Sequence, residues 1–223
     1  MKTMNLNKSY AFPLAKVSVY VPLNYEKVNS YPALLVSDGD FFPFGEMNLD
    51  CIVVALTPSN RSGPFSPFPV TNGDPKMKEF TGEGKCYNDW LINELLPVLD
   101  KDFSFDKGNL NYGGVSLGGL EAIYSLYFHD CFASVFSICG SFWFPGFVEF
   151  VRSNKTVSQS KVVILNGSKE GAGNKNSVFS NALSSAKEVA NLLNAEFSLD
   201  DYGHHGHLEE RFDFVLKTIG LTK

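Results

Sequence analysis

A serine among glycines stands near the middle of the chain, where Gly114, Ser116 and Gly118 spell G-x-S-x-G. A nucleophilic serine on a sharp strand-to-helix turn has strained backbone angles, and neighbours without side chains let strand and helix approach closely. Residues 109–112 resemble a short strand, and residues 117–129 have helical apolar spacing. We therefore expect a nucleophile at Ser116; the alternative is a glycine-rich loop whose serine merely caps a helix.

A serine hydroxyl is a weak nucleophile at neutral pH, so it needs a base and a carboxylate that orients the base. In α/β-hydrolases the chain order is serine, acid, histidine. Glu170 lies in a loop after the apolar run 162–165, and we expect it to be the acid. An ordinary exposed loop glutamate is the alternative. Asp200 and Asp201 suit the role less well, because they are too close in sequence to the histidines to reach them from across a crevice.

The base is expected among the three histidines of residues 202–207, which are His204, His205 and His207. The fourth histidine, His129, stands at the end of the predicted helix after the serine. Three close histidines could also bind a metal, but no carboxylate or cysteine stands in fixed register with them. We expect no metal site, and spacing alone does not choose among the three imidazoles.

Composition favours a single soluble domain over residues 1–223, with 44% apolar and 19% charged residues. The net charge of −5 without a basic cluster argues against nucleic acid and against an anionic membrane surface. We expect a small-molecule or uncharged substrate, while homo-oligomerisation stays open. The chain has neither a signal-like start nor a membrane span, and its four cysteines lack CxxC spacing. We therefore expect a cytoplasmic protein with reduced thiols.

Apolar runs typical of buried parallel strands alternate with segments of helical spacing, and residues 17–21 alternate like a strand with one solvated face. The apolar runs are 33–36, 51–56, 135–139 and 162–165, and the helical segments are 88–101, 117–129, 177–193 and 208–219. This order predicts an α/β sheet with helices on both faces. Two irregular stretches, 57–87 and 140–161, follow strands, and we expect them to form the pocket walls.

Several further segments carry a family resemblance: residues 31–39, which end in Asp-Gly; Arg61; residues 90–97; the aromatic run 141–143; and residues 167–170. With the serine motif, they make the chain resemble the putative-esterase family of α/β-hydrolases, which includes esterase D, enterochelin esterases and bacterial tributyrin esterases. The resemblance covers the chain from about residue 31 to the C-terminus. It implies an α/β-hydrolase fold, a mostly parallel central sheet and ester hydrolysis without a cofactor.

The resemblance also favours one histidine. In the family, large apolar residues follow the histidine about five, nine and twelve positions later. Counting from His207 reaches such residues, which are Phe212, Leu216 and Ile219. We therefore expect His207 to be the base, with His205 as the second choice because the family's paired glycines and following acidic residue are not matched.

The family's oxyanion hole implies two backbone N–H groups here, from Leu117 and from the segment at Asp40. Together these expectations describe a serine carboxylesterase that works through an acyl-enzyme. A cytoplasmic enterochelin-type siderophore esterase is a specialised alternative, since the Asp38-Gly39 segment is similar to that branch. A hydrolase-fold binding protein without catalytic activity is the alternative from another class. The role of Arg61, loop anchor or substrate contact, is left open.

Overall fold

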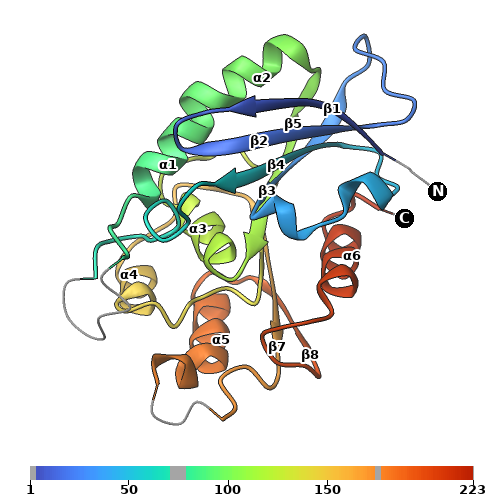
Figure 1. Ribbon diagram of the computed structural model, residues 1–223. Coiled ribbons are helices and arrows are strands. Elements are labelled where there is room, and N and C mark those ends of the chain that lie inside the picture. Colours follow the sequence, from blue (N-terminus) through green and yellow to red (C-terminus); the bar gives the residue numbers. More distant parts are fainter. Residues whose placement is uncertain (1–3, 71–78, 174–176, 223) are drawn as a thin grey trace.

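The computed structural model describes residues 4–70, 79–173 and 177–222 and contains one eight-stranded sheet (Figure 1). The strand order is β1-β2-β4-β3-β5-β6-β7-β8. The strands β1 and β2 run antiparallel to their neighbours. The other six strands, β4, β3, β5, β6, β7 and β8 in sheet order, run parallel to one another. Their bounds are β1 Met4–Ala11, β2 Ala15–Pro22, β3 Tyr31–Ser37, β4 Ile52–Pro58, β5 Phe105–Val115, β6 Ser134–Ile138, β7 Lys161–Gly167 and β8 Glu196–Asp200.

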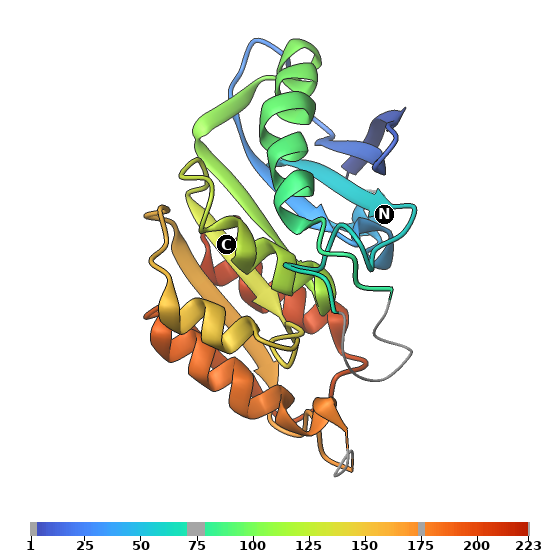
Figure 2. The ribbon, with the colours of Figure 1, turned by 90° about the vertical axis from the view of Figure 1, so that its left-hand side faces the viewer.

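Helices cover both faces of the sheet, as Figures 1 and 2 show. The helices α1 to α5 lie on one face, and α6 lies on the other together with the short 3₁₀ helices η1 (Gly39–Phe41) and η2 (Phe44–Glu46). The other bounds are α1 Gly84–Trp90, α2 Leu96–Asp102, α3 Leu117–Ser125, α4 Phe147–Ser153, α5 Ala182–Leu192 and α6 Leu208–Thr218. The predicted α/β-hydrolase fold with a mostly parallel sheet is confirmed.

Two apolar cores, one on each face, explain why these elements form. On the α6 face, Phe212 packs against Phe42 with ring centroids 4.2 Å apart and the rings tilted by 33°, and both rings are buried. On the opposite face, buried side chains of α1 and α3 pack against the central strands. Parallel strands buried on both sides need continuous apolar runs, which is the pattern the sequence carries. The predicted runs correspond to β3, β4, β6 and β7.

The structure corrects three expectations about regular structure. The helix predicted to start at residue 88 starts at Gly84, and a π-helical turn at Leu91–Leu95 joins α1 to α2. The stretch 140–161, expected to be irregular, contains α4, whose aromatic side chains pack on α3. The strand β1 was not predicted, because this edge strand exposes most of its residues and so lacks an apolar alternation.

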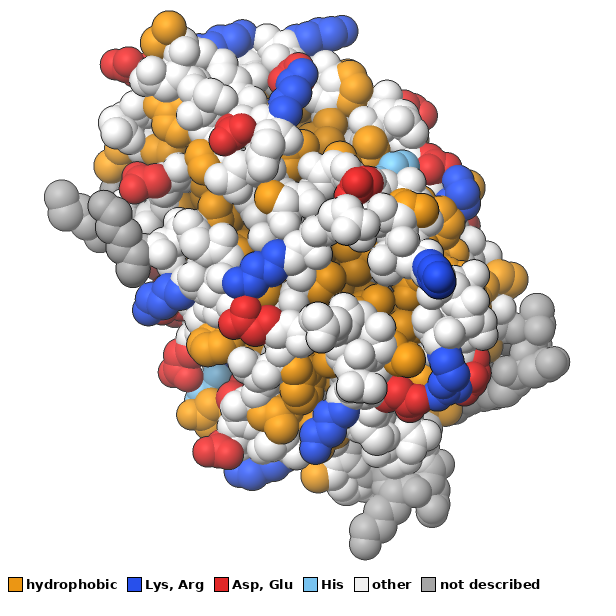
Figure 3. All heavy atoms as spheres, turned by 180° about the vertical axis from the view of Figure 1, so that it is seen from behind, with side chains coloured by type: hydrophobic (Ala, Val, Ile, Leu, Met, Phe, Trp, Pro, Cys, Tyr) orange, Lys and Arg blue, Asp and Glu red, His pale blue; other side chains and the backbone are white. Residues whose placement is uncertain are grey.

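Charged side chains of both signs are interspersed on the face drawn in Figure 3, which views the molecule from behind. None of the helices among the described residues is both long and apolar enough to cross a membrane. The four cysteines are free thiols, with Cys51 and Cys139 buried.

Candidate active site

Ser116 occupies a sharp turn between β5 and α3. Its backbone angles are φ 57° and ψ −119°, a conformation that side-chain-bearing residues adopt rarely and at a cost. Its amide donates to the Ile138 carbonyl at 3.0 Å, which ties the turn to the neighbouring strand β6. The strained turn therefore holds the hydroxyl at the carboxyl edge of the parallel strands, where ligands bind in open α/β sheets.

Gly114 and Gly118 are needed because strand and helix meet closely at this turn. A Cβ on Gly114 would lie 2.8 Å from the backbone carbon of Gly118. A Cβ on Gly118 would lie 2.9 Å from the Ser37 Cβ and 3.1 Å from an Asp38 carboxylate oxygen. The G-x-S-x-G spacing thus has the steric role predicted from the sequence, and it also brings α3 against the end of β3.

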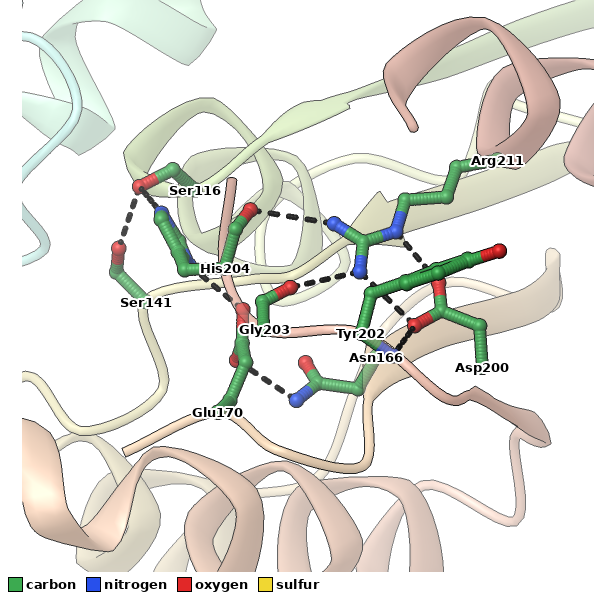
Figure 4. Close-up of polar contacts among 9 residues, drawn as sticks. All are labelled: Ser116, Ser141, Asn166, Glu170, Asp200, Tyr202, Gly203, His204 and Arg211. Atoms are coloured by element: carbon green, nitrogen blue, oxygen red, sulfur yellow. Dashed lines mark hydrogen bonds and ion pairs between the residues drawn. The ribbon is translucent and has the colours of Figure 1, made fainter. Parts of the chain in front are cut away.

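Three side chains from different elements converge at the turn (Figure 4). His204 Nε2 lies 3.1 Å from Ser116 Oγ, and His204 Nδ1 lies 2.6 Å from Glu170 Oε1. Glu170 follows β7, as predicted, but it is buried rather than an exposed loop residue, with 5% of its surface accessible. In the neutral imidazole, a proton on Nδ1 is donated to the carboxylate, which leaves Nε2 to accept the proton of the serine hydroxyl.

The structure does not place His207 or His205 between the serine and the acid. His207 is the residue before α6, with φ 55°; its ring stacks on Tyr202 and lies 3.2 Å from Glu210. His205 is exposed and meets the His204 ring edge-to-face. The phase of α6 is as predicted, since Phe212 and Leu216 are buried. The error arose because helix phase does not determine how the loop before the helix turns.

Glu170 is held by neighbours besides the histidine. Asn166, buried at the end of β7, donates from Nδ2 to Glu170 Oε2 at 2.7 Å. The buried thiol of Cys139 also lies against this carboxylate, and burial, with the adjacent negative charge, raises the pKa of Cys139 well above its ordinary value. Because both carboxylate oxygens are engaged, Glu170 has little freedom to leave the imidazole.

Arg211 anchors the loop that carries the histidine. Its guanidinium binds Asp200 through Nε at 2.5 Å and Nη2 at 2.9 Å. It also donates to the carbonyls of Gly203 at 2.7 Å and His204 at 3.1 Å. Burial alone would raise the pKa of Asp200, but the hydrogen bonds from Arg211 and the Tyr202 amide, together with nearby positive charge, outweigh it and lower that pKa. Asp200, the rival acid considered above, therefore binds Arg211.

The two segments expected to supply the oxyanion hole lie next to each other. Leu117 begins α3, and Asp40 lies in η1, which starts at the residue after Asp38. A Cβ on Gly118, in the first turn of α3, would lie 3.1 Å from the Asp38 carboxylate, so the two segments approach closely. Arg61 Nη2 binds the Asp38 carboxylate at 2.5 Å. Burial raises the pKa of Asp38 to about 6, although the Arg61 cation opposes this rise. Arg61 therefore anchors the loop that carries Asp40, which is one of the two roles left open above.

A buried polar cluster lies behind the turn. The hydroxyl of Tyr112 donates to Glu121 of α3, and Ser37 Oγ lies 2.9 Å from the same hydroxyl. Burial raises the pKa of Glu121 to about 8, and hydrogen bonds from Tyr112 and Asn88 only partly oppose it. The carboxyl group is therefore protonated at neutral pH, which avoids a buried charge in this core.

A pocket of about 330 Å³ opens beside Ser116. Trp143 and Phe179 form one wall, with their rings 4.5 Å apart in an edge-to-face contact. The lining residues are Ser116, Trp143, Glu170, Gly171, Phe179, Ala182, His204 and His205. A larger hollow of about 790 Å³ lies between η2 and α6, but Ser116 does not line it. The reactive groups therefore face a small, largely apolar space.

Among the described residues, one group has the composition of a metal site: Cys139, Glu170 and His204, whose ligand atoms lie within 4.8 Å of one another. The arrangement does not suit a metal. Burial raises the pKa of Cys139, so a metal would have to displace the thiol proton before it could bind the thiolate. The nitrogen of His204 that faces Glu170 is already within hydrogen-bond distance of it.

Sequence reasoning missed three residues that shape this site: Asn166, Arg211 and Ser141. Ser141 Oγ lies 3.1 Å from Ser116 Oγ (Figure 4). The run 141–143 was noted as a family feature, and its position after β6 could have placed it near Ser116. Asn166 and Arg211 carry no local pattern that distinguishes them from ordinary polar residues.

Solved structures share this fold across nearly the whole chain. The BES protein from Bacillus cereus is 18% identical, with a TM-score of 0.75 over 98% of this chain and 96% of that one. The siderophore hydrolase EstA from Aspergillus nidulans is 15% identical, with a TM-score of 0.70 over 100% and 96%. The enterobactin and salmochelin hydrolase IroE is 16% identical, with a TM-score of 0.67 over 97% and 95%. At these identities the likeness shows the fold alone.

The family is shown by the sequence itself. No curated protein matches the chain. The family described as "Putative esterase" matches residues 14–214, which is most of the chain and includes the serine turn, the acid and the histidine loop. The chain therefore belongs to the putative esterase family and is a serine ester hydrolase.

Proposed function

We propose that the protein is a carboxylesterase in which Ser116 is the nucleophile, His204 the general base and Glu170 the residue that orients the base. The observation that carries this proposal is the chain of contacts from Ser116 Oγ through His204 to Glu170 Oε1, at 3.1 and 2.6 Å. Such a chain activates a serine on unrelated folds, so the arrangement rather than the chain position defines the role. The turn at Ser116 is then a nucleophile elbow.

The reaction has two halves. Ser116 Oγ attacks the ester carbonyl while His204 Nε2 takes its proton; the alcohol then leaves with that proton. Water next attacks the acyl-enzyme, again losing a proton to His204, and the Ser116 oxygen leaves and is reprotonated. We propose that the amides of Leu117 and Asp40 stabilise the oxyanion. The close approach of Asp38 to the first turn of α3, where a Cβ on Gly118 would lie 3.1 Å from its carboxylate, supports this pairing.

The pocket suggests the class of substrate. Its volume of about 330 Å³ is at the lower end of the range of about 300 to 1,000 Å³ for small-molecule sites. Its wall of Trp143 and Phe179 is apolar, and the described lining residues include neither lysine nor arginine. We therefore expect uncharged esters with short or aromatic acyl groups to be hydrolysed best.

Hydrolysis of a siderophore ester is a second candidate, because two of the three structural neighbours described above are named for siderophore or enterobactin hydrolysis. An anionic catecholate would gain from cationic side chains, which the described lining lacks. A panel of nitrophenyl esters, run beside an iron-siderophore hydrolysis assay, separates the two. Faster turnover of the siderophore would refute our choice of substrate class.

Fluorophosphonate labelling tests the nucleophile directly. We expect one label per chain on the wild type and none on the Ser116→Ala variant, which should also lose ester hydrolysis while keeping its fold. A wild type that takes no label and hydrolyses no ester would indicate a binding protein with the hydrolase fold.

A further inference from the structure

The hydroxyl of Ser141 also contacts the reacting oxygen of Ser116, in addition to the histidine chain described above (Figure 4). The two oxygens are 3.1 Å apart. Ser141 is fully buried and lies shortly after β6, which ends at Ile138. Its amide donates to the Ser116 carbonyl at 3.0 Å, and its own carbonyl accepts from the Phe144 amide at 2.9 Å. Backbone contacts on both sides therefore hold Ser141 beside the nucleophile.

The direction of this hydrogen bond follows from the proton count. The Nδ1 proton of His204 faces Glu170, so Nε2 accepts the proton of the Ser116 hydroxyl. Ser116 has no second proton to give. The hydrogen bond between the two serines must then be donated by the Ser141 hydroxyl and accepted by Ser116 Oγ.

We propose that Ser141 is a further catalytic residue, whose hydroxyl donates a hydrogen bond to Ser116 Oγ and stabilises the negative charge that this oxygen gains in both halves of the reaction. In acylation, Oγ gives its proton to His204 before its bond to the carbonyl carbon is complete. In deacylation, the bond from the acyl carbon to Oγ breaks, and Oγ carries charge until His204 returns a proton. This inference rests on the esterase proposal above.

The size of the effect follows from the charge on the acceptor. A hydrogen bond to a charged group contributes more than one between neutral groups. We therefore expect Ser141→Ala to lower kcat by roughly ten- to one-hundredfold. The rate of fluorophosphonate labelling should fall by a similar factor, since it also requires attack by Oγ. KM should change little, because Ser141 does not line the pocket.

Ser137 offers a matched control. It is also a fully buried serine, it lies on β6, and its hydroxyl has no hydrogen-bond partner among the described residues. Ser137→Ala removes the same atom without removing a contact to Ser116. We expect this variant to keep wild-type kcat and labelling rates. Ser141→Thr, which keeps the hydroxyl, should recover most of the activity lost in Ser141→Ala.

The experiment measures kcat, KM, labelling rate, melting temperature and the pH profile of kcat/KM for the wild type and these three variants with a nitrophenyl ester. An unchanged apparent pKa for the base would show that His204 and Glu170 are still paired. Ser141→Ala activity within threefold of Ser137→Ala, or Ser141→Thr as impaired as Ser141→Ala, would overturn this inference alone. A wild type without hydrolysis or labelling would overturn the esterase proposal and this inference with it.

Discussion

Replacing Arg211 by lysine tests whether the loop of His204 must be anchored from behind. Arg211 is 3% exposed and makes four hydrogen bonds, two to the Asp200 carboxylate and two to the carbonyls of Gly203 and His204. A lysine ammonium is a compact point charge, so it cannot reproduce the planar fork that spans both groups. We expect it to keep the Asp200 contact and to release the two carbonyls.

The magnitude follows from those two lost contacts. Each hydrogen bond from a charged donor contributes about 1.5 to 3 kcal/mol, so the loop loses roughly 3 to 6 kcal/mol of restraint at most. A shift of about 1 Å in a reacting group lowers the rate by about one-hundredfold. We therefore expect Arg211→Lys to lower kcat by about two orders of magnitude. KM should change less, because the aromatic wall of Trp143 and Phe179 is untouched.

The assay is steady-state hydrolysis of a short nitrophenyl ester, with fluorophosphonate labelling and thermal unfolding measured in parallel. Arg152→Lys is the control, because Arg152 is another arginine that pairs with acidic side chains, those of Glu149 and Glu188, but it is exposed. We expect the control to keep its activity. If Arg211→Lys kept its kcat within threefold of this control while its melting temperature fell, the anchoring argument would be wrong.

Three further predictions concern the catalytic groups and the buried carboxyl. His204→Ala should lower kcat by about three orders of magnitude or more, whereas His207→Ala should stay within a few-fold of the wild type; the reverse result would restore His207 as the base. Glu170→Gln should lower turnover about 10²- to 10⁴-fold with little change in KM, and normal turnover would remove it from the mechanism. Burial raises the pKa of Glu121 from 4.5 to about 8, so the folded protein holds this proton more tightly than the unfolded chain does. The stability that this proton gives is therefore fully present below pH 4.5 and is lost as the pH rises to about 8. Denaturant unfolding at pH 5 and pH 8.5 should therefore show Glu121→Gln gaining stability relative to the wild type, by about 5 kcal/mol at most. An equal difference at the two pH values would contradict the burial argument.

Local sequence patterns were sufficient to predict most of the fold, and they also identified Ser116 and Glu170 of the proposed mechanism. Continuous apolar runs specify strands buried on both faces, because a polar side chain that is buried there without a partner costs free energy. The glycines around Ser116 identify a close strand-to-helix turn, since any side chain at Gly114 would collide with α3. Glu170 follows from its place after β7, where side chains meet at the carboxyl edge of the sheet.

Tertiary structure alone decided which histidine meets the serine. His204, His205 and His207 lie within four residues, so their spacing cannot distinguish them, and the phase of α6 only describes residues after the helix has begun. The choice depends on Arg211, which reaches back from α6 to Asp200 and holds the His204 carbonyl. Such contacts join residues whose types are unremarkable in the sequence, and they exist only once the sheet and α6 have packed together.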